Sequence, residues 1–357
     1  MGIVNFDYNK LINGEKDHRI GKWATKLSAV IEDTMIATEG DYELTKLLYN
    51  VADSDSAFES VAIEDGIGLM KATLDGNKPR VDQNTFIGEK TWKHIPYTTQ
   101  IDFTRQYLKD CHYKLNQQQG AKAKQIPNSY YKTREKIAQL GYIMGEQSVL
   151  SFNGGDTPLT TYDGKPLFHK QHSFGAANGH ANGTQSNLFY VVDPDPTSGK
   201  IAEYIQQLSI NTRQMKDSNG DAQQFTADTI LIPGNRGKME LATRQALGSD
   251  FWPGGNYNDI NPQAGRWNMN VLPDWELAAG GPDFEIITVS QDAKENMASM
   301  FWDREPLEVT ADYDLATKIY SFYGYTRFSL GHANYRHTTR LKIFKTKPSD
   351  VSAWTEL

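Results

Sequence analysis

One long helical pattern constrains the fold more than any other feature of this chain. It covers residues 129–152, where Ile137, Leu140 and Met144 form an apolar line at helical spacing. About 24 residues at about 1.5 Å rise span roughly 36 Å, which is long for a helix inside one domain. Asn153 and Gly154 follow it and can adopt the left-handed backbone of a helix end. We therefore expect a helix whose two ends are covered by different parts of the protein.

The second half of the chain alternates between helix and strand patterns. Residues 200–216 place Ile201, Tyr204, Ile205 and Leu208 on one face of a predicted helix. Further helices are predicted over 235–247 and, before the long helix, over 104–119. Apolar runs predict strands over 228–233, 267–272, 284–290, 305–310, 316–330 and 340–346. This combination indicates an α+β fold.

Three segments of the chain would bury little surface in a monomer. Residues 1–55 are polar with scattered apolar anchors, and they predict an extended arm with a short helix over 23–33. Residues 56–102 predict a long two-stranded hairpin, which is marginal in water without further packing. Residues 249–266 form a loop with aromatic residues at its tip. Because each segment needs another surface to lie on, the combination points to assembly.

His169 and His172 are the clearest candidates for metal ligands. Two histidines three residues apart can share one face of a helix and bind zinc with a third ligand. Here they follow Pro166 at the start of a loop, and Asp163 could be the third ligand only if the loop folded back. The alternative is that the two histidines hydrogen-bond to the loop backbone or stack at a contact. A metal-dependent hydrolase that uses His169 and His172 is the enzymatic hypothesis.

Other motifs do not predict catalysis or a cofactor. The Gly237-Lys238 pair lacks both the upstream glycine and the following Ser or Thr of a phosphate-binding loop. The single cysteine, Cys111, lies at an apolar helical position, so we expect a buried and inert thiol. We therefore expect a protein that is not an enzyme and that binds no cofactor.

The charge balance argues against a protein that binds nucleic acid through a general basic surface. The chain has 37 Lys and Arg residues against 44 Asp and Glu residues, a net charge of −7, whereas phosphate neutralisation needs clustered basic residues. The N-terminal residues lack the basic and apolar regions of a signal peptide. No run of about 18 apolar residues predicts a transmembrane helix. The acidic balance does not exclude a container whose wall must not adhere to its contents.

Three stretches of sequence, taken with the order of the parts, carry a resemblance to a known family. They are residues 102–110, which begin Asp102-Phe103-Thr104-Arg105, residues 162–188, which begin Tyr162-Asp163-Gly164-Lys165-Pro166-Leu167-Phe168-His169, and residues 227–233, Ala227-Asp228-Thr229-Ile230-Leu231-Ile232-Pro233. In these the chain resembles the tailed-phage major capsid proteins of the HK97 fold, and most of all the major head subunits of Mu-like phages. It departs from HK97 itself in having no evident N-terminal scaffolding domain, and the crosslinking residues of that phage cannot be placed.

The resemblance implies a domain organisation for the whole chain. Residues 1–55 would be the N-terminal arm, 56–102 the E-loop hairpin, and 103–194 the P-domain with its spine helix over 129–152. Residues 195–300 would be the axial A-domain, and 301–357 the P-domain strands and C-terminus. The implied contacts between subunits are Ile20, Trp23 and Leu27 in the arm, Leu74, Asp75, Gly76, Asn77, Lys78 and Arg80 at the E-loop tip, and Phe251, Trp252 and Tyr257 near the capsomer axis.

The resemblance also implies a structural function. The protein would self-assemble into hexamers and pentamers of an icosahedral shell around double-stranded DNA, in the host cytoplasm, and would end in the virion capsid. Its partners would be other copies, a scaffolding protein, a portal and decoration proteins, with weak DNA contact and no membrane. An encapsulin-like nanocompartment shell protein is the alternative within the same fold.

Overall fold

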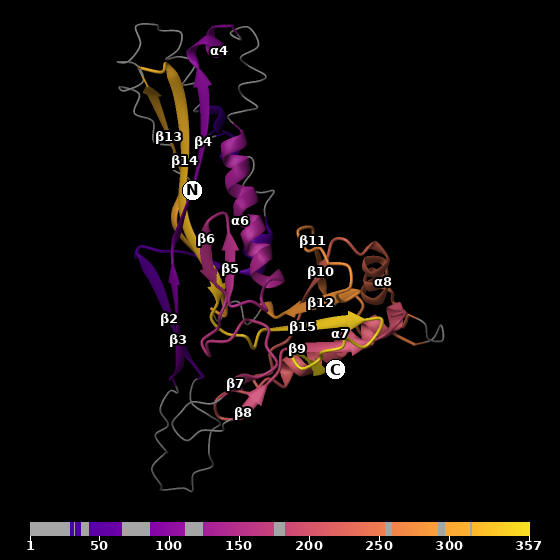
Figure 1. The fold of residues 1–357 in the computed structure, drawn as a ribbon. Coiled ribbons are helices and arrows are strands. Elements are labelled where there is room, and N and C mark those ends of the chain that lie inside the picture. The colour runs from indigo at the N-terminus through magenta and orange to yellow at the C-terminus, as the bar shows by residue number, and fades with distance from the viewer. Residues whose placement is uncertain are drawn as a thin grey trace, which may run out of the picture. The chain divides into compact units, whose positions relative to one another are not determined.

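The computed structural model (Figure 1) describes residues 29–31, 33–36, 43–65, 86–110, 124–174, 183–253, 259–291, 297–314 and 316–357. The chain forms two compact units. Unit 1 combines Met1–Glu59, Trp92–Ala138 and Phe301–Leu330, and unit 2 combines Ser60–Thr91, Gln139–Met300 and Gly331–Leu357. Each unit is therefore assembled from segments that lie far apart in the sequence.

Unit 1 is built on a four-stranded sheet with the strand order β1-β13-β14-β4. Its strands are β1 (Asn50–Asp53), β13 (Ser299–Asp314), β14 (Ile319–His332) and β4 (Ile95–Thr104), and a short helix, α3 (Leu44–Leu48), precedes β1. β14 and β4 run antiparallel, from Ile319 opposite Thr104 to Phe328 opposite Ile95. Side chains of β4 alternate between exposed and at least half-buried positions, so one face of this strand is turned to the core.

Helix α6 (Gln125–Ile143) packs its first turns on the apolar face of this sheet. Ile126 and Tyr130 belong to one buried cluster with the strand residues Phe103, Leu307, Val309, Tyr320 and Phe322. Gly324 permits this close packing, because a Cβ atom there would lie 2.9 Å from side-chain atoms of Ile126 and Thr99. The helix thus approaches the sheet at a residue without a side chain.

The long helix differs from its predicted range and is followed by a hairpin. The predicted spine helix over 129–152 is wrong at both ends, since α6 begins at Gln125 and ends at Ile143. The last predicted residues instead form β5 (Val149–Phe152), which pairs with β6 (Gly155–Pro158). Asn153 and Gly154 join the two strands with φ angles of 48° and 84°, as the turn of a tight hairpin requires. The same dipeptide signals a helix end and a hairpin turn, which explains the error.

The predicted hairpin over 56–102 is shorter in the structure. Strands β2 (Phe58–Glu64) and β3 (Phe86–Lys93) form a two-stranded ribbon, whose connection lies outside the described residues. The next strand, β4, leaves the ribbon and pairs with β14. The predicted helix over 104–119 begins as α4 (Arg105–Asp110), and its remainder, with Cys111, lies outside the described residues.

Two strands of unit 1 extend well beyond their predicted ranges. The pattern over 305–310 predicts a short strand, but β13 begins at Ser299 and ends at Asp314. Charged residues conceal the extension, because Asp303 and Arg304 interrupt the apolar pattern. Both are half-buried and paired: Asp303 binds Arg134 at 2.7 Å, and Arg304 donates to the carbonyl oxygen of Ser54 at 2.9 Å. The second strand, predicted over 316–330, becomes β14, which ends at His332.

Unit 2 contains a six-stranded mixed sheet in the order β11-β10-β12-β15-β9-β16. Its strands are β11 (Asn268–Leu272), β10 (Thr229–Pro233), β12 (Phe284–Val289), β15 (Thr338–Phe344), β9 (Leu188–Val192) and β16 (Thr355–Glu356). β12 is antiparallel to both β10 and β15, whereas β9 is parallel to β15. Every residue of β10 and β12 is buried, so their continuous apolar runs reflect strands covered on both faces. A smaller hairpin pairs β7 (His172–Phe174) with β8 (Gly183–Gln185).

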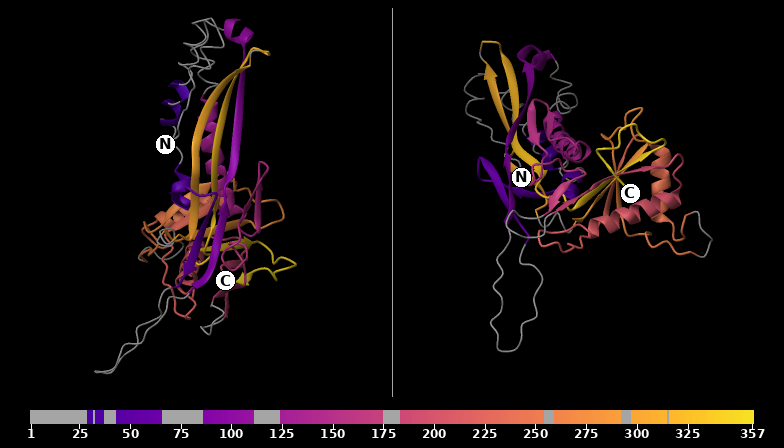
Figure 2. Two further views of the ribbon diagram at one scale, coloured as in Figure 1. Left: turned by 90° about the vertical axis from the view of Figure 1, so that its left-hand side faces the viewer. Right: turned by 60° about the horizontal axis from the view of Figure 1, so that its bottom comes forward.

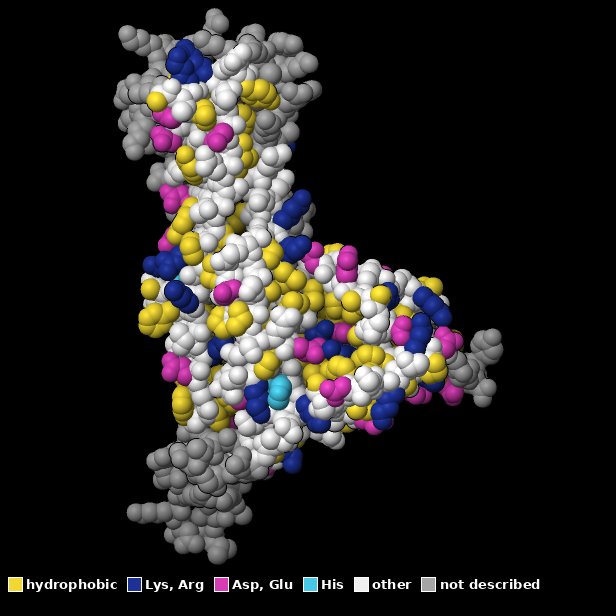
Figure 3. All heavy atoms as spheres, in the orientation of Figure 1, with side chains coloured by type: hydrophobic (Ala, Val, Ile, Leu, Met, Phe, Trp, Pro, Cys, Tyr) yellow, Lys and Arg dark blue, Asp and Glu magenta, His cyan; other side chains and the backbone are white. Residues whose placement is uncertain are grey.

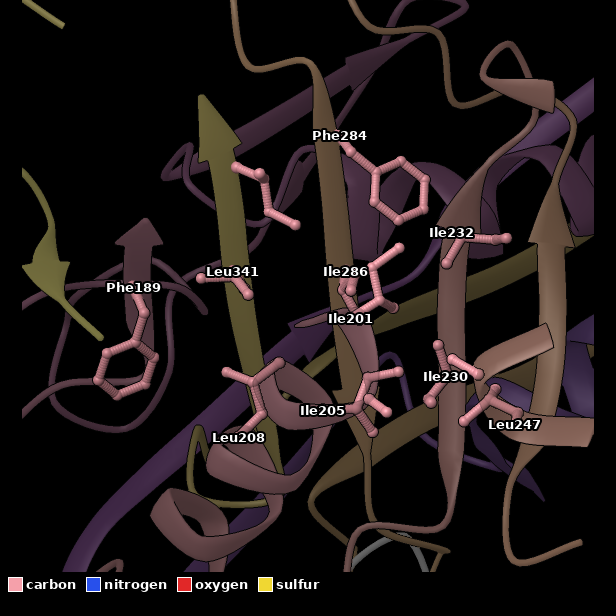
Figure 4. Packing of buried hydrophobic residues seen from close by; sticks show 13 residues of the cluster. Phe189, Ile201, Ile205, Leu208, Ile230, Ile232, Leu247, Phe284, Ile286 and Leu341 are labelled. Atoms are coloured by element: carbon pink, nitrogen blue, oxygen red, sulfur yellow. The ribbon is translucent and has the colours of Figure 1, made fainter. Parts of the chain in front are cut away.

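Two helices supply the rest of the core of unit 2. α7 (Ser198–Arg213) lies alongside the strands in the right-hand view of Figure 2, and α8 (Gly237–Gly248) follows β10. Ile201 and Ile205 of α7 lie against Ile230 of β10 and Ile286 of β12 in the packed cluster of Figure 4. Both helices match the predicted ranges, 200–216 and 235–247, to within a few residues. The sheet and helices together confirm an α+β fold.

Charged side chains lie buried within this sheet and are paired there. The guanidinium of Arg340 in β15 lies 5.4 Å and 5.2 Å from the ring centroids of Phe168 and Trp275 and donates to Glu285 of β12. The side chains of Arg340 and Glu285 are only 5% and 4% exposed, so their pairing offsets the loss of water around both charges. Arg340 also lies 3.3 Å from Glu146 and donates to the carbonyl oxygen at the end of α6. This network ties β12, β15 and the end of α6 together.

We expect Glu285→Gln to lower the free energy of unfolding by about 3 kcal/mol, because Arg340 and Lys342 are then left with Glu146 as their one shared counter-charge. Chemical denaturation of the full chain, followed by circular dichroism, measures the change. Asp195→Asn is the matched control, since Asp195 pairs with Lys238 at the surface, with side chains 77% and 83% exposed. Loss of this surface pair should lower the free energy of unfolding by less than about 1 kcal/mol. Equal losses in the two variants would contradict the role of the buried pair.

Candidate functional site

The two predicted metal ligands are engaged within their own loop. The His172 ring is closed off from solvent, with Nδ1 2.8 Å from Oδ2 of Asp163 and Nε2 3.1 Å from the carbonyl oxygen of Leu167. It stacks on the Tyr335 ring at a centroid distance of 3.8 Å. Nδ1 of His169 accepts a hydrogen bond from a backbone N–H two residues later. The hydrogen-bonded alternative therefore describes these histidines.

Asp163 fixes the same loop by accepting hydrogen bonds from three of its groups. It accepts from the hydroxyl of Thr161, the backbone N–H of Lys165 and the ring of His172. Burial by itself would raise the pKa of Asp163, but the hydrogen bonds from His172 and Thr161 outweigh it and lower the pKa below its ordinary value. In the described part of the chain, no three His, Cys, Asp or Glu side chains are placed to hold a metal ion. The geometry thus gives no support to a metal-dependent hydrolase.

A buried lysine anchors strand β3 of the ribbon. Lys90 is 6% exposed, and its ammonium donates to the carbonyl oxygens of Pro158 and Thr160 and lies 3.2 Å from the Thr160 hydroxyl. These partners are uncharged, so burial dominates and lowers the pKa of Lys90 from 10.5 to about 8. Gly88 lets the same strand lie close to Tyr162, since a Cβ atom there would be 3.1 Å from the Tyr162 Cβ.

An ion pair anchors the ribbon at the end of β2. Asp65 binds Arg336 of the loop after β14, and the two side chains are 2% and 0% exposed. Asp65 also accepts from the backbone N–H of Ser218 at 2.6 Å. The guanidinium lies 5.7 Å and 5.8 Å from the ring centroids of Tyr162 and Tyr335. Sequence patterns do not identify these anchors, because the partners lie far apart along the chain.

An exposed apolar pair lies in the predicted aromatic loop. Phe251 and Ile260 face each other across a small hairpin and are 53% and 81% exposed. Backbone hydrogen bonds close the hairpin on both sides of this pair, and Trp252 packs with the core of unit 2. Asn261 fixes the hairpin to the end of α8, because its amide donates to the carbonyl oxygen of Ala246 at 2.8 Å. Ile260 was missed by sequence reasoning; an apolar residue within an Asn- and Asp-rich stretch was the available signal.

The structure places only part of the predicted contact set. Phe251 and Trp252 lie in this hairpin, whereas Tyr257 lies outside the described residues. The same holds for the arm residues Ile20, Trp23 and Leu27, and for Leu74, Asp75, Gly76, Asn77, Lys78 and Arg80 of the hairpin tip. Their contacts remain predictions.

No family model matches the sequence, and no curated protein matches it. Solved structures do match the fold. The capsid of Myoviridae phage XM1 is 12% identical over 84% of this chain and 92% of that chain, with a TM-score of 0.51. The capsid of cyanophage P-SCSP1u is 11% identical over 84% of this chain and 87% of that chain, with a TM-score of 0.50. The chain has the HK97 fold of tailed-phage capsid proteins.

The structural matches confirm the HK97 fold that the sequence resemblance implies. The particular likeness to Mu-like head subunits stays a prediction, as do the domain boundaries. On the face of the molecule shown in Figure 3, acidic and basic side chains are interspersed with apolar ones. Among the described residues, no helix has the length and apolar character needed to cross a membrane.

The lowered pKa of Lys90 predicts an unusual dependence of stability on pH. Between about pH 8 and pH 10.5 the unfolded chain keeps the Lys90 proton while the folded chain releases it, so stability rises with pH. Relative to Lys90→Met, the free energy of unfolding of the unchanged protein should rise by about 2 kcal/mol between roughly pH 7 and pH 10. Denaturant titrations of both proteins across this range measure the difference, in which other titrating groups cancel. Parallel curves would show that burial does not perturb Lys90.

Proposed function

We propose that this protein is the major capsid subunit of a tailed phage, and that it assembles as hexamers and pentamers into an icosahedral shell around double-stranded DNA. The fold match to two phage capsids, which extends over 84% of this chain, carries the proposal. Closed shells arise when one subunit makes heterologous contacts that close around symmetry axes. The role is structural, and the side chains of His169, His172 and Asp163 serve to hold the backbone of their loop in place.

The segments that bury little surface in one chain become contacts between subunits under this proposal. The ribbon β2–β3 is the base of the E-loop, which reaches over an adjacent subunit, and the arm, residues 1–55, lies across a neighbour. Residues 103–194 and 301–357 form the P-domain, and residues 195–300 form the A-domain. The exposed Phe251 and Ile260 support a contact near the capsomer axis, because clustered apolar surface marks an interaction site.

The charge of the chain is consistent with the contents of such a shell. A net charge of −7 gives weak rather than adhesive contact with packaged DNA. Scaffolding, portal and decoration proteins are the expected partners during assembly in the host cytoplasm. Expression of the chain, alone and with its genomic neighbours, followed by negative-stain microscopy, tests the proposal. Shells are expected, and a chain that stays monomeric under every condition would contradict it.

Deletion of residues 74–80 should block shell formation and leave the subunit folded. The reason is that this segment is proposed to contact a neighbouring subunit rather than its own core. Thermal unfolding and sedimentation of the deleted chain measure the two effects separately. A chain that fails to fold without these residues would argue against the E-loop assignment.

The double substitution Phe251→Ser and Ile260→Ser should reduce assembly at least tenfold at a fixed subunit concentration. Burying the two side chains in a contact is expected to contribute about 3 kcal/mol, which is more than the 1.4 kcal/mol of a tenfold change. Light scattering during assembly measures the loss, and the unfolding midpoint of the free subunit should not fall. Val149→Ser is the control, at a 45% exposed residue of β5. Equal loss of assembly in the control would remove the special role of the pair.

A further inference from the structure

A buried polar cluster in unit 2 takes no part in the proposed contacts between subunits. It consists of Tyr142 near the end of α6, Ser299 at the start of β13, His332 at the end of β14, and His337 just before β15. None of the four residues is more than 1% exposed. Because β13 begins and β14 ends in unit 2, while both strands belong to the sheet of unit 1, the cluster holds one end of each long strand.

The hydroxyl of Ser299 joins the two histidine rings. Its Oγ lies 2.8 Å from Nδ1 of His332, 2.7 Å from Nε2 of His337 and 3.1 Å from the hydroxyl oxygen of Tyr142. The serine has one proton to donate, so it can donate to only one of the two rings, and the other ring has to donate to it. Two neutral rings satisfy this arrangement, because a neutral imidazole has one donor and one acceptor nitrogen.

The titratable groups that face these rings in the described part of the chain offer no counter-charge. The Tyr142 ring lies edge-on to His332 at a centroid distance of 4.7 Å, and the two histidine rings lie 6.0 Å apart. Lys90 of β3 adds a positive charge that acts on His332. Burial lowers the pKa of His337 to about 4, and burial, His337 and Lys90 together hold the pKa of His332 well below its ordinary value.

Acid favours a form of the protein in which this cluster is open. The closed cluster keeps both histidines neutral, whereas an open cluster admits water, and its histidines take up protons at the ordinary pKa of about 6.5. The closed form is therefore fully favoured above about pH 7, and it loses its advantage as the pH falls below about 6.5. At about pH 5, each histidine shifts the balance toward the open form roughly 30-fold.

We propose that this cluster is an acid-sensitive latch, in which proton uptake by His332 and His337 releases the ends of β13 and β14 from α6. The backbone N–H of Ala333 donates to the carbonyl oxygen of Ala298 at 2.8 Å. This bond joins the two strand ends to each other, so they are expected to separate from the helix together. The inference does not depend on the proposed shell function, because it concerns the free chain.

Hydrogen–deuterium exchange of the free full-length chain at about pH 7.5 and about pH 5 tests the latch, once the rates are corrected for the intrinsic effect of pH on exchange. Amides of residues 298–302 and 330–338 are expected to exchange at least about tenfold faster at the lower pH, because local opening exposes them. Amides of α7, which lies in the same unit, should keep their protection. This comparison separates opening of the latch from acid unfolding of the whole unit.

Substitutions at the two histidines test which groups take up the protons. His332→Asn and His337→Gln each place an amide near the nitrogen that meets Ser299 and remove one titration. The double variant should lose the response to acid, and each single variant should reduce it. His169→Asn is the control, since His169 is half-buried and hydrogen-bonds within its own loop, and it should keep the full response.

Three results would overturn the latch. They are an unchanged rate of exchange at the strand ends, an equal loss of protection in α7, and variants that respond to acid as the unchanged protein does. If the double variant does not fold, the comparison of His337→Gln with the unchanged protein decides.

Discussion

Buried ion pairs hold unit 2 together, because they join residues that lie far apart in the sequence. Asp65 and Arg336 are 271 residues apart, and Arg340 joins β15 to Glu285 of β12. Loss of one partner leaves a lone buried charge, which is far more costly than the pair is favourable. Such pairs also select the strand register. Glu285 lies opposite Lys342 and Arg340 opposite Ile287, and a slip of β15 by one residue would turn Arg340 to the face of the sheet opposite Glu285.

The ribbon illustrates why these anchors matter. A two-stranded ribbon is marginal by itself, and the exposed Phe58 and Phe86 do not bury enough apolar surface to fix it. Lys90 fixes β3 through oxygens of the segment after β6, and Asp65 fixes β2 through Arg336. The base of the proposed E-loop is therefore joined to the rest of unit 2 through buried polar contacts, which require a definite geometry.

Sequence patterns predicted the helices and strands whose formation depends on their own apolar residues. Helices α7 and α8 and strands β10 and β12 lie close to their predicted ranges, because each has a continuous apolar run or a helical face. The end of α6 was wrong because Asn153-Gly154 suits two backbone states, and the pairing of β5 with β6 decides between them. The length of β13 was hidden by Asp303, whose partner Arg134 lies on another element. The ion pair of Asp65 with Arg336 could not be predicted, since the two residues meet only in the folded chain.

The proposed capsid subunit has to stay soluble alone and yet recognise its neighbours, and exposed and buried side chains of this fold contribute differently to these two demands. The exposed side chains of Phe251 and Ile260 can pack against any apolar surface. A pair of residues therefore carries a lower risk of aggregation than a large apolar patch would. The Asp65–Arg336 pair is closed to solvent and so offers nothing to a neighbouring surface. Under the proposed function, recognition between subunits therefore rests on a few exposed apolar residues, whereas the buried ion pairs keep each subunit folded.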